Sequence, residues 1–450
     1  MVQELIIHLG DHKTGSTAIQ DALKAGGFAI ATGDLCYAPN GRNNNLLAAP
    51  LMGLVPDPAR AAPHWEHCAR VLRASTARWG VLSAEHFENV APGDLDRALR
   101  THLPEYRDRL RLVSYVRPHA DRFLSSFTEV AKLGQDVLPI DRFLARSLRR
   151  GMLSYAPRLA RWRAVFGESF HVRPFLRERL EGGDAVRDFL GFIAGPGAEI
   201  RLEQGFRSNE SLSLEDLALM IHLQRRVAEA LAGRPELHHR VRHALGWHMA
   251  PLLNQQPGAV RTPPRLHREL ALRIQDACRG DAAETDRQWF GGDPLLATAL
   301  ERAPEATVAE AQSYALADHF GPAEIRLIGI WAEVLVRLAQ ADPGHFADAI
   351  RNAAPPRGHP RANARARAAR RAGAAPGAGG EVPGGLAAGL SPRPGQRLGQ
   401  RLGQRLGQTL DRTLAFARRA GYHVLLRLRR AGPPRNRTQP ARHSDRQPDP

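Results

Sequence analysis

Residues 4–20 read Glu4-Leu-Ile-Ile-His-Leu-Gly-Asp-His-Lys-Thr-Gly-Ser-Thr-Ala-Ile-Gln20. The apolar run at 5–9, with its branched side chains, predicts a buried strand of a parallel sheet. Residues 10–15 form a turn of small and polar residues, and the apolar spacing after Ser16 predicts a helix. In this order, the N–H groups of the loop and of the helix N-terminus converge on one point. The segment therefore predicts a binding site for phosphate or sulfate.

The two glycines have the spacing of the nucleotide-binding loop G-x-x-x-x-G-K-[ST], but the lysine is displaced. Ser16 follows Gly15 where that loop has lysine, and Lys13 lies inside the turn. A lysine within the turn lies closer to the inner, bridging part of a phosphoanhydride than to the outer phosphates of a triphosphate. This position argues against ATP with magnesium. A small-molecule kinase with a variant phosphate loop stays open as an alternative.

A second segment, Val113–Phe127, has Arg117 at the end of an expected strand and Ser125 on the helix that follows. A planar guanidinium and a hydroxyl in this arrangement can share one phosphate. Together with His-Lys-Thr-Gly-Ser-Thr-x-x-Gln at 12–20, the segment resembles sulfotransferases that use 3′-phosphoadenosine 5′-phosphosulfate (PAPS), in their bacterial or carbohydrate-type branch. A weaker likeness lies at 207–213. The resemblance covers roughly residues 4–340.

The resemblance implies a role for each residue of the two motifs. Lys13 would contact the bridging oxygen, where negative charge grows as the 3′,5′-bisphosphate (PAP) leaves. Backbone N–H groups of the loop and helix would bind the 5′-phosphate, and Arg117 with Ser125 would bind the 3′-phosphate. The expected donor-binding residues are Lys13, Thr14, Gly15, Ser16, Thr17, Arg117 and Ser125. PAPS is the implied sulfuryl donor, and the arrangement requires no metal ion.

In-line sulfuryl transfer also needs a base, because the hydroxyl or amine acceptor must lose a proton. Glu85 and His86 follow the strand expected at 79–83, and ligands of open parallel sheets bind at the carboxyl ends of the strands. Glu85 is the first candidate for the base and His86 the second, while His12 is expected to shape the loop. Lys13, Glu85 and His86 are thus the expected catalytic residues, and the resemblance implies a glycan or glycan-like acceptor.

Five short apolar segments alternate with helical patterns over the first 210 residues. They predict an α/β fold, a three-layer α/β/α sandwich with a central parallel sheet. The resemblance implies the P-loop NTPase-like sulfotransferase fold. From about Leu214 to Gln340 the pattern is almost wholly helical. We therefore expect one sulfotransferase domain at 1–350, with a donor-binding core at 1–210 and a mainly helical acceptor-side part at 211–350.

The last hundred residues carry the charge of the chain. Residues 351–450 contain 21 arginines and four acidic residues, a difference equal to the whole net charge of +17. Their Ala, Gly, Pro and Arg composition predicts a disordered tail. Apolar spacing at 409–430 predicts a basic amphipathic helix that contacts an anionic membrane surface, a nucleic acid or an acidic glycan. A solvated tail without such a role, and a non-enzymatic nucleotide- or nucleic-acid-binding protein acting through the tail, are the alternatives.

The cysteines and the lengths of the apolar segments indicate the cellular compartment. Three cysteines without metal-ligand spacing predict a reducing environment. The N-terminal apolar run is too short for a signal sequence, and no apolar segment is long enough to span a bilayer. The sequence therefore predicts a cytoplasmic protein that is not transmembrane. Its basic tail would place it at the periphery of the inner membrane surface.

Overall fold

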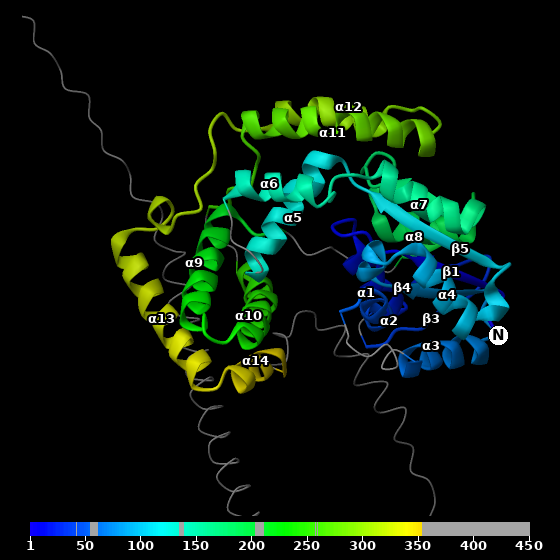
Figure 1. Ribbon diagram of the computed structural model, residues 1–450, viewed down its shortest axis with the longest axis horizontal. Coiled ribbons are helices and arrows are strands. Elements are labelled where there is room, and N and C mark those ends of the chain that lie inside the picture. The colour runs from blue at the N-terminus through cyan, green and yellow to red at the C-terminus, as the bar shows by residue number, and fades with distance from the viewer. Residues whose placement is uncertain are drawn as a thin grey trace, which may run out of the picture. The chain divides into compact units, whose positions relative to one another are not determined.

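The computed structural model describes residues 1–41, 43–54, 62–134, 139–202, 211–256, 258 and 260–352 (Figure 1). The chain divides into two compact units. The first contains Met1–Ala131, Asp136–Ser213 and Pro263–Ser313, and the second contains Lys132–Gln135, Leu214–Thr262 and Tyr314–Pro450. The tail from residue 353 onward, including the helix predicted at 409–430, lies outside the described residues, as does the part of the third motif at 207–210.

The first unit is built on a five-stranded parallel sheet with the order β3-β4-β1-β5-β6. Its strands are β1 (Glu4–His8), β3 (Leu35–Tyr37), β4 (Trp79–Ser83), β5 (Leu110–Val116) and β6 (Phe170–Pro174). β1 lies in the middle, where Ile6 pairs with Val81 of β4 and Arg111 of β5. β1 and β4 overlap the strands predicted at 5–9 and 79–83, and β5 ends directly before Arg117 as expected. The prediction of an α/β fold with a central parallel sheet is confirmed.

Helices cover both faces of the sheet. The helices that begin in the first unit are α1 (Ser16–Ala25), α2 (Asn45–Leu51), α3 (Ala62–Ala74), α4 (Pro92–His102), α5 (His119–Leu133), α6 (Ile140–Arg149), α7 (Ala156–Phe166), α8 (Ala185–Ala194), α11 (Arg268–Trp289) and α12 (Leu295–Arg302). Neighbouring residues of a strand point to opposite faces. In β6, His171 packs on Phe192 of α8, and Phe170 stacks on Trp162 of α7. These contacts place α8 and α7 on opposite faces, as expected for a three-layer sandwich.

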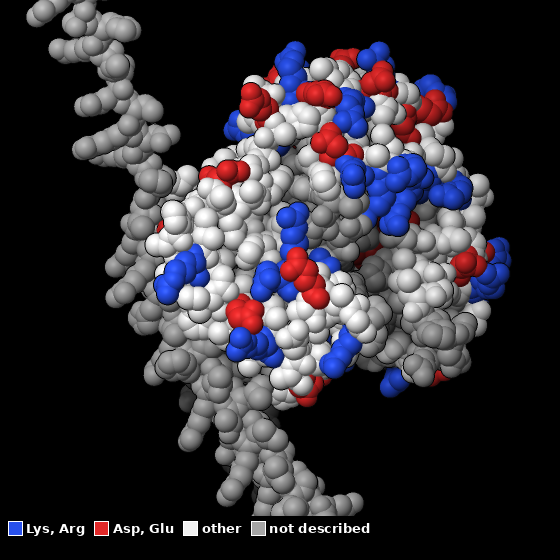
Figure 2. All heavy atoms as spheres, turned by 60° about the vertical axis from the view of Figure 1, so that its left-hand side comes forward, with Lys and Arg blue, Asp and Glu red and all other residues white. Residues whose placement is uncertain are grey.

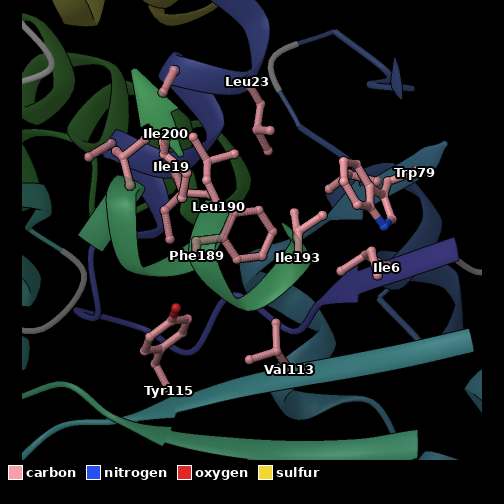
Figure 3. Close-up of a cluster of buried hydrophobic side chains, with 14 of the residues drawn as sticks. Ile6, Ile19, Leu23, Trp79, Val113, Tyr115, Phe189, Leu190, Ile193 and Ile200 are labelled. Atoms are coloured by element: carbon pink, nitrogen blue, oxygen red, sulfur yellow. The ribbon is translucent and has the colours of Figure 1, made fainter. Parts of the chain in front are cut away.

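A core of apolar side chains joins the sheet to α1 and α8 (Figure 3). Ile6 and Val113 point from β1 and β5 toward Phe189 of α8, and Ile19 of α1 packs beside Leu190. All five side chains are fully buried. Because α1 begins directly after the loop 10–15, this packing holds the helix N-terminus against the carboxyl end of β1.

A second, two-stranded sheet was not predicted. β2 (Phe28–Ile30) and β7 (Ile200–Leu202) are antiparallel, with Phe28 opposite Leu202. Each strand has only three residues, and the two are far apart in the chain. Neither is long enough to show an alternating pattern, so only the pairing itself reveals them.

The described part of the second unit is helical. Its helices are α9 (Leu214–Ala230), α10 (Pro235–Gln255), α13 (Pro322–Ala341) and α14 (Pro343–Asn352), and α9 packs on α10 and α13 while α10 packs on α14. The segment Pro263–Ser313, which lies within the range 211–350, belongs to the first unit. Among the described helices, none combines the length and the apolar character needed to cross a membrane.

Acidic and basic side chains are mixed on the surface. Figure 2 shows Asp and Glu interspersed with Lys and Arg over most of one face, together with one continuous group of Lys and Arg. Residues 1–350 hold 42 basic and 42 acidic residues, so the excess charge of the sequence belongs to the tail.

Candidate functional site

The three central strands bring the predicted site residues to one edge of the sheet. The loop 10–15 follows β1, Glu85 follows β4 and Arg117 follows β5. Since β4, β1 and β5 are parallel neighbours, their carboxyl ends lie side by side. Ligands of open α/β sheets bind at this edge. The candidate site is therefore assembled by the strand order.

The loop 10–15 has an unusual backbone. Gly10, Lys13 and Gly15 have positive φ angles of 63°, 68° and 79°, and Lys13 is the only non-glycine residue of the described chain in this region. Left-handed residues alternating with others turn successive N–H groups toward one concave face, which suits an anion. A non-glycine residue held in this conformation is also typical of functional sites. Gly15 gives α1 no side-chain cap, so no capping side chain covers the first turn of the helix.

Gly10→Ala should destabilise the protein by about 2–3 kcal/mol. A Cβ at Gly10 would lie 2.6 Å from the carbonyl oxygen of Ala84, at a φ of 63° that L-residues disfavour. Gly26→Ala is the matched control, because Gly26 has a φ of 65° but nothing within 4 Å of its Cβ position. Urea denaturation should show the smaller loss, about 1 kcal/mol, in the control. Equal losses would mean that the close approach of the loop to Ala84 is not a constraint.

Lys13 and Arg117 are brought together. The Arg117 guanidinium donates from Nη1 to the backbone carbonyl of Lys13 at 3.0 Å. The Lys13 ammonium donates to Oε2 of Glu129 on α5 at 3.2 Å. Glu129 lies one helical turn after Ser125, so both face the same side of α5. The two sequence motifs, about a hundred residues apart, thus form one site.

Arg117 is a half-buried cation without a carboxylate partner among the described residues. Burial lowers its pKa, and the charge of Asp121 offsets this only in part. The guanidinium also lies 5.8 Å from the ring centre of Phe175. No described hydrogen bond joins Arg117 to the half-buried hydroxyl of Ser125. A desolvated guanidinium with unused donors is suited to an external anion such as phosphate.

The backbone around Arg117 is held by α7 and α11. The Tyr155 hydroxyl donates to the Arg117 carbonyl at 2.7 Å. Asp281 of α11 contacts His119 at 2.9 Å and accepts from the N–H groups of Tyr155 and Ala156 at 2.9 Å and 3.0 Å. The segment Pro263–Ser313 therefore supports the turn that carries Arg117.

The first candidate base is engaged by the loop. The Ser16 hydroxyl donates to Oε1 of Glu85 at 2.5 Å. His86 donates its backbone N–H to Asn45, and burial together with the charge of His12 lowers its pKa. Thr14 is buried, and its hydroxyl donates to the Asp11 carbonyl at 2.5 Å, which leaves only its backbone N–H for a ligand. Thr17 lies in the first turn of α1 and is half-buried.

A buried network of charges lies under the loop and was not predicted. Arg122 of α5 contacts Glu88 at 2.8 Å, and Arg158 of α7 contacts Asp11 at 2.6 Å. Asp11 also accepts hydrogen bonds from the hydroxyl of Ser114 and the N–H of Tyr115. Asp11 and Glu88 are buried, so each carboxylate depends on its arginine. The sequence shows these acidic and basic residues, but no rule of sequence spacing predicts which of them form ion pairs.

His12 joins this network from the loop. Oε2 of Glu88 accepts from the backbone N–H of His12 at 2.9 Å and lies 2.6 Å from His12 Nδ1. Burial alone would lower the pKa of His12, but the hydrogen bond and charge of Glu88 outweigh it and raise the pKa above 6.5. Burial would likewise raise the pKa of Glu88, but Arg122 and His12 hold it well below 4.5. Glu88 is therefore ionised near neutral pH, and its carboxylate favours the protonated form of His12.

No family model, no curated protein and no solved structure matches this chain. In the described residues, no group of three or more His, Cys, Asp or Glu is arranged to hold a metal ion. The chemistry of the site has to be judged from its own geometry.

Proposed function

We propose that the protein is a PAPS-dependent sulfotransferase. One observation carries this proposal: the Arg117 guanidinium donates to the carbonyl of Lys13 in the left-handed turn of the loop. The contact links an anion-binding loop to a second cation that has no acidic partner among the described residues. A donor with phosphates at both its 5′ and 3′ positions requires two such groups, whereas ATP requires only the first.

Each motif then has a task in donor binding. The N–H groups from Thr14 to Thr17 would bind the 5′-phosphate at the start of α1. Arg117 would bind the 3′-phosphate through a planar pair of donors, with the Ser125 hydroxyl as a further donor. Lys13 would turn from Glu129 toward the bridging oxygen, where charge develops as PAP leaves. The sequence resemblance and the contact between Arg117 and Lys13 both support this account.

The acceptor is proposed to be a hydroxyl or amine of a glycan or glycan-like molecule, as the resemblance implies. Its oxygen or nitrogen would attack the sulfur in line with the bridging oxygen. The protein mainly positions the two reactants and balances charge. A base must then take the acceptor proton. Glu85, His86 and His12 all lie at this edge of the sheet.

The activity can be tested with the full-length chain and radiolabelled PAPS. The protein is incubated with pooled desulfated glycans, amines and alcohols, in buffer with EDTA. The expected result is release of PAP together with transfer of the label to one fraction of the pool. Consumption of ATP with magnesium by the same preparation, with no turnover of PAPS, would instead support the small-molecule kinase.

Arg117→Ala should weaken PAP binding by about 30- to 150-fold, because a charge-assisted pair of hydrogen bonds contributes about 2–3 kcal/mol. Binding of 5′-AMP, which has no 3′-phosphate, should change less than about threefold. Arg107→Ala, at an exposed arginine of the same unit, is the control. Calorimetric titration of the wild type and of Arg117→Ala with PAP and with 5′-AMP gives the coupling energy between Arg117 and the 3′-phosphate. Equal losses for PAP and 5′-AMP would contradict the assignment of the 3′-phosphate to Arg117.

A further inference from the structure

His12 is the histidine of the loop 10–15, and its two ring nitrogens have different surroundings. Nδ1 lies 2.6 Å from the buried carboxylate of Glu88. The side chain is still 38% exposed, whereas that of Glu88 is 7% exposed. The buried partner therefore fixes the ring on its Nδ1 side. An ionised carboxylate can only accept a hydrogen bond, so the nitrogen that faces it must carry the proton. Neutral His12 is therefore protonated at Nδ1 and has a lone pair on Nε2.

This arrangement is that of an imidazole base oriented by a buried carboxylate. Glu88 is itself anchored, because Arg122 contacts its second oxygen at 2.8 Å. Glu85, in contrast, accepts the Ser16 hydroxyl at 2.5 Å. His12 also directly precedes Lys13, which has been assigned to the bridging oxygen. Of the three candidates, His12 is the one whose imidazole is oriented by a buried carboxylate among the described residues.

We infer that His12 Nε2 is the general base of sulfuryl transfer and that Glu88 is its positioning residue. The inference rests on the proposed function. An oxygen lone pair of the acceptor attacks the sulfur of PAPS, and the bond from sulfur to the bridging oxygen breaks. The electron pair of that bond leaves with PAP. The acceptor proton moves to His12 Nε2, and the resulting imidazolium is stabilised by Glu88.

The ionisable groups around His12 agree with this role. They are Glu88, Glu85 and His86 on the segment after β4, Arg122 on α5 and, beyond Glu88, Arg158 on α7. The carboxylates outweigh the cations, and the pKa of His12 is raised above 6.5. A base with a pKa near the working pH is the most effective. The rate should therefore rise with pH through an inflection above 6.5 as His12 loses its proton.

The test uses water as the acceptor, so no natural acceptor is needed. Single-turnover hydrolysis of radiolabelled PAPS by the full-length chain is compared with that by His12→Ala and by the control His67→Ala, at an exposed histidine of α3. We expect His12→Ala to lose about 100-fold or more in rate while PAP affinity changes less than about threefold. Added imidazole should restore part of the rate in His12→Ala, and the pH inflection should be absent from that variant.

The outcomes separate this inference from the proposed function. If PAP does not bind the wild-type chain, the proposed function fails. If PAP binds but His12→Ala hydrolyses PAPS as fast as the wild type, or the wild type hydrolyses it no faster than buffer, His12 is not the base. A larger loss in Glu85→Gln or His86→Asn than in His12→Ala would also overturn the inference. A loss of PAP affinity equal to the loss in rate would give His12 a role in donor binding instead.

Discussion

Lys13→Ala should lower the single-turnover rate of PAPS cleavage by about 100- to 1000-fold. Removing one preorganised group that stabilises developing charge costs about 2.7–4 kcal/mol in the transition state. The charge on the bridging oxygen is small in bound PAPS and grows as the bond breaks. PAP binding should therefore weaken by a smaller factor than the rate. Quenched-flow measurement of PAP release, paired with calorimetric PAP binding, gives both quantities.

Lys24→Ala is the matched control, because Lys24 is an exposed lysine near the end of α1. Its rate and its PAP affinity should be those of the wild type. A Lys13→Ala variant whose rate and affinity fall equally would show uniform binding of donor and transition state. Lys13 would then bind the donor without stabilising the reaction, contrary to its assignment to the bridging oxygen.

Glu88→Gln should lower the free energy of unfolding at pH 7 by about 3–5 kcal/mol, because it leaves buried charge without its partner. Arg122 is 3% exposed and has Glu88 as its acidic contact at 2.8 Å. Glu88 also accepts two hydrogen bonds from His12. The amide keeps the shape of the carboxylate but removes the charge. The loss should appear as a lower midpoint of urea denaturation with an unchanged m-value.

The same carboxylate predicts a dependence on pH. Its folded pKa lies well below the ordinary value of 4.5, so its stabilisation is complete above about 4.5 and is lost as the pH falls further. The wild type should therefore lose stability more steeply below pH 4.5 than Glu88→Gln. Glu66→Gln, at an exposed residue of α3, should behave as the wild type. Parallel acid-side curves for the wild type and Glu88→Gln would contradict the buried ion pair.

Local patterns were sufficient for the frame of the site. The apolar run of β1, the two glycines of the loop and the apolar spacing of α1 each follow from short-range chemistry. Arg117 could be placed at the same edge as Lys13 because both follow strands of a parallel sheet. The left-handed conformation of Lys13 was beyond reach, because a lysine has no preference for a positive φ that a sequence rule could use.

The supporting residues could not be predicted, because their partners are distant in sequence. Glu88 meets His12 from 76 residues away, and Asp281 meets His119 from 162 residues away. No periodicity in the sequence connects such pairs. Taken alone, each of these residues would be predicted to lie exposed on the surface. The assignment of Pro263–Ser313 to the unit with the sheet has the same cause, since α11 is recognised as a support of Arg117 only through Asp281.

The central claim is that the site binds a nucleotide with a 3′-phosphate and without magnesium. Calorimetric titration of the full-length chain with PAP, with and without EDTA, and with ATP and magnesium tests this claim most directly. The account predicts micromolar PAP binding that EDTA does not change, and ATP binding weaker by at least about tenfold. Preference for ATP with magnesium, or loss of PAP binding in EDTA, would contradict it.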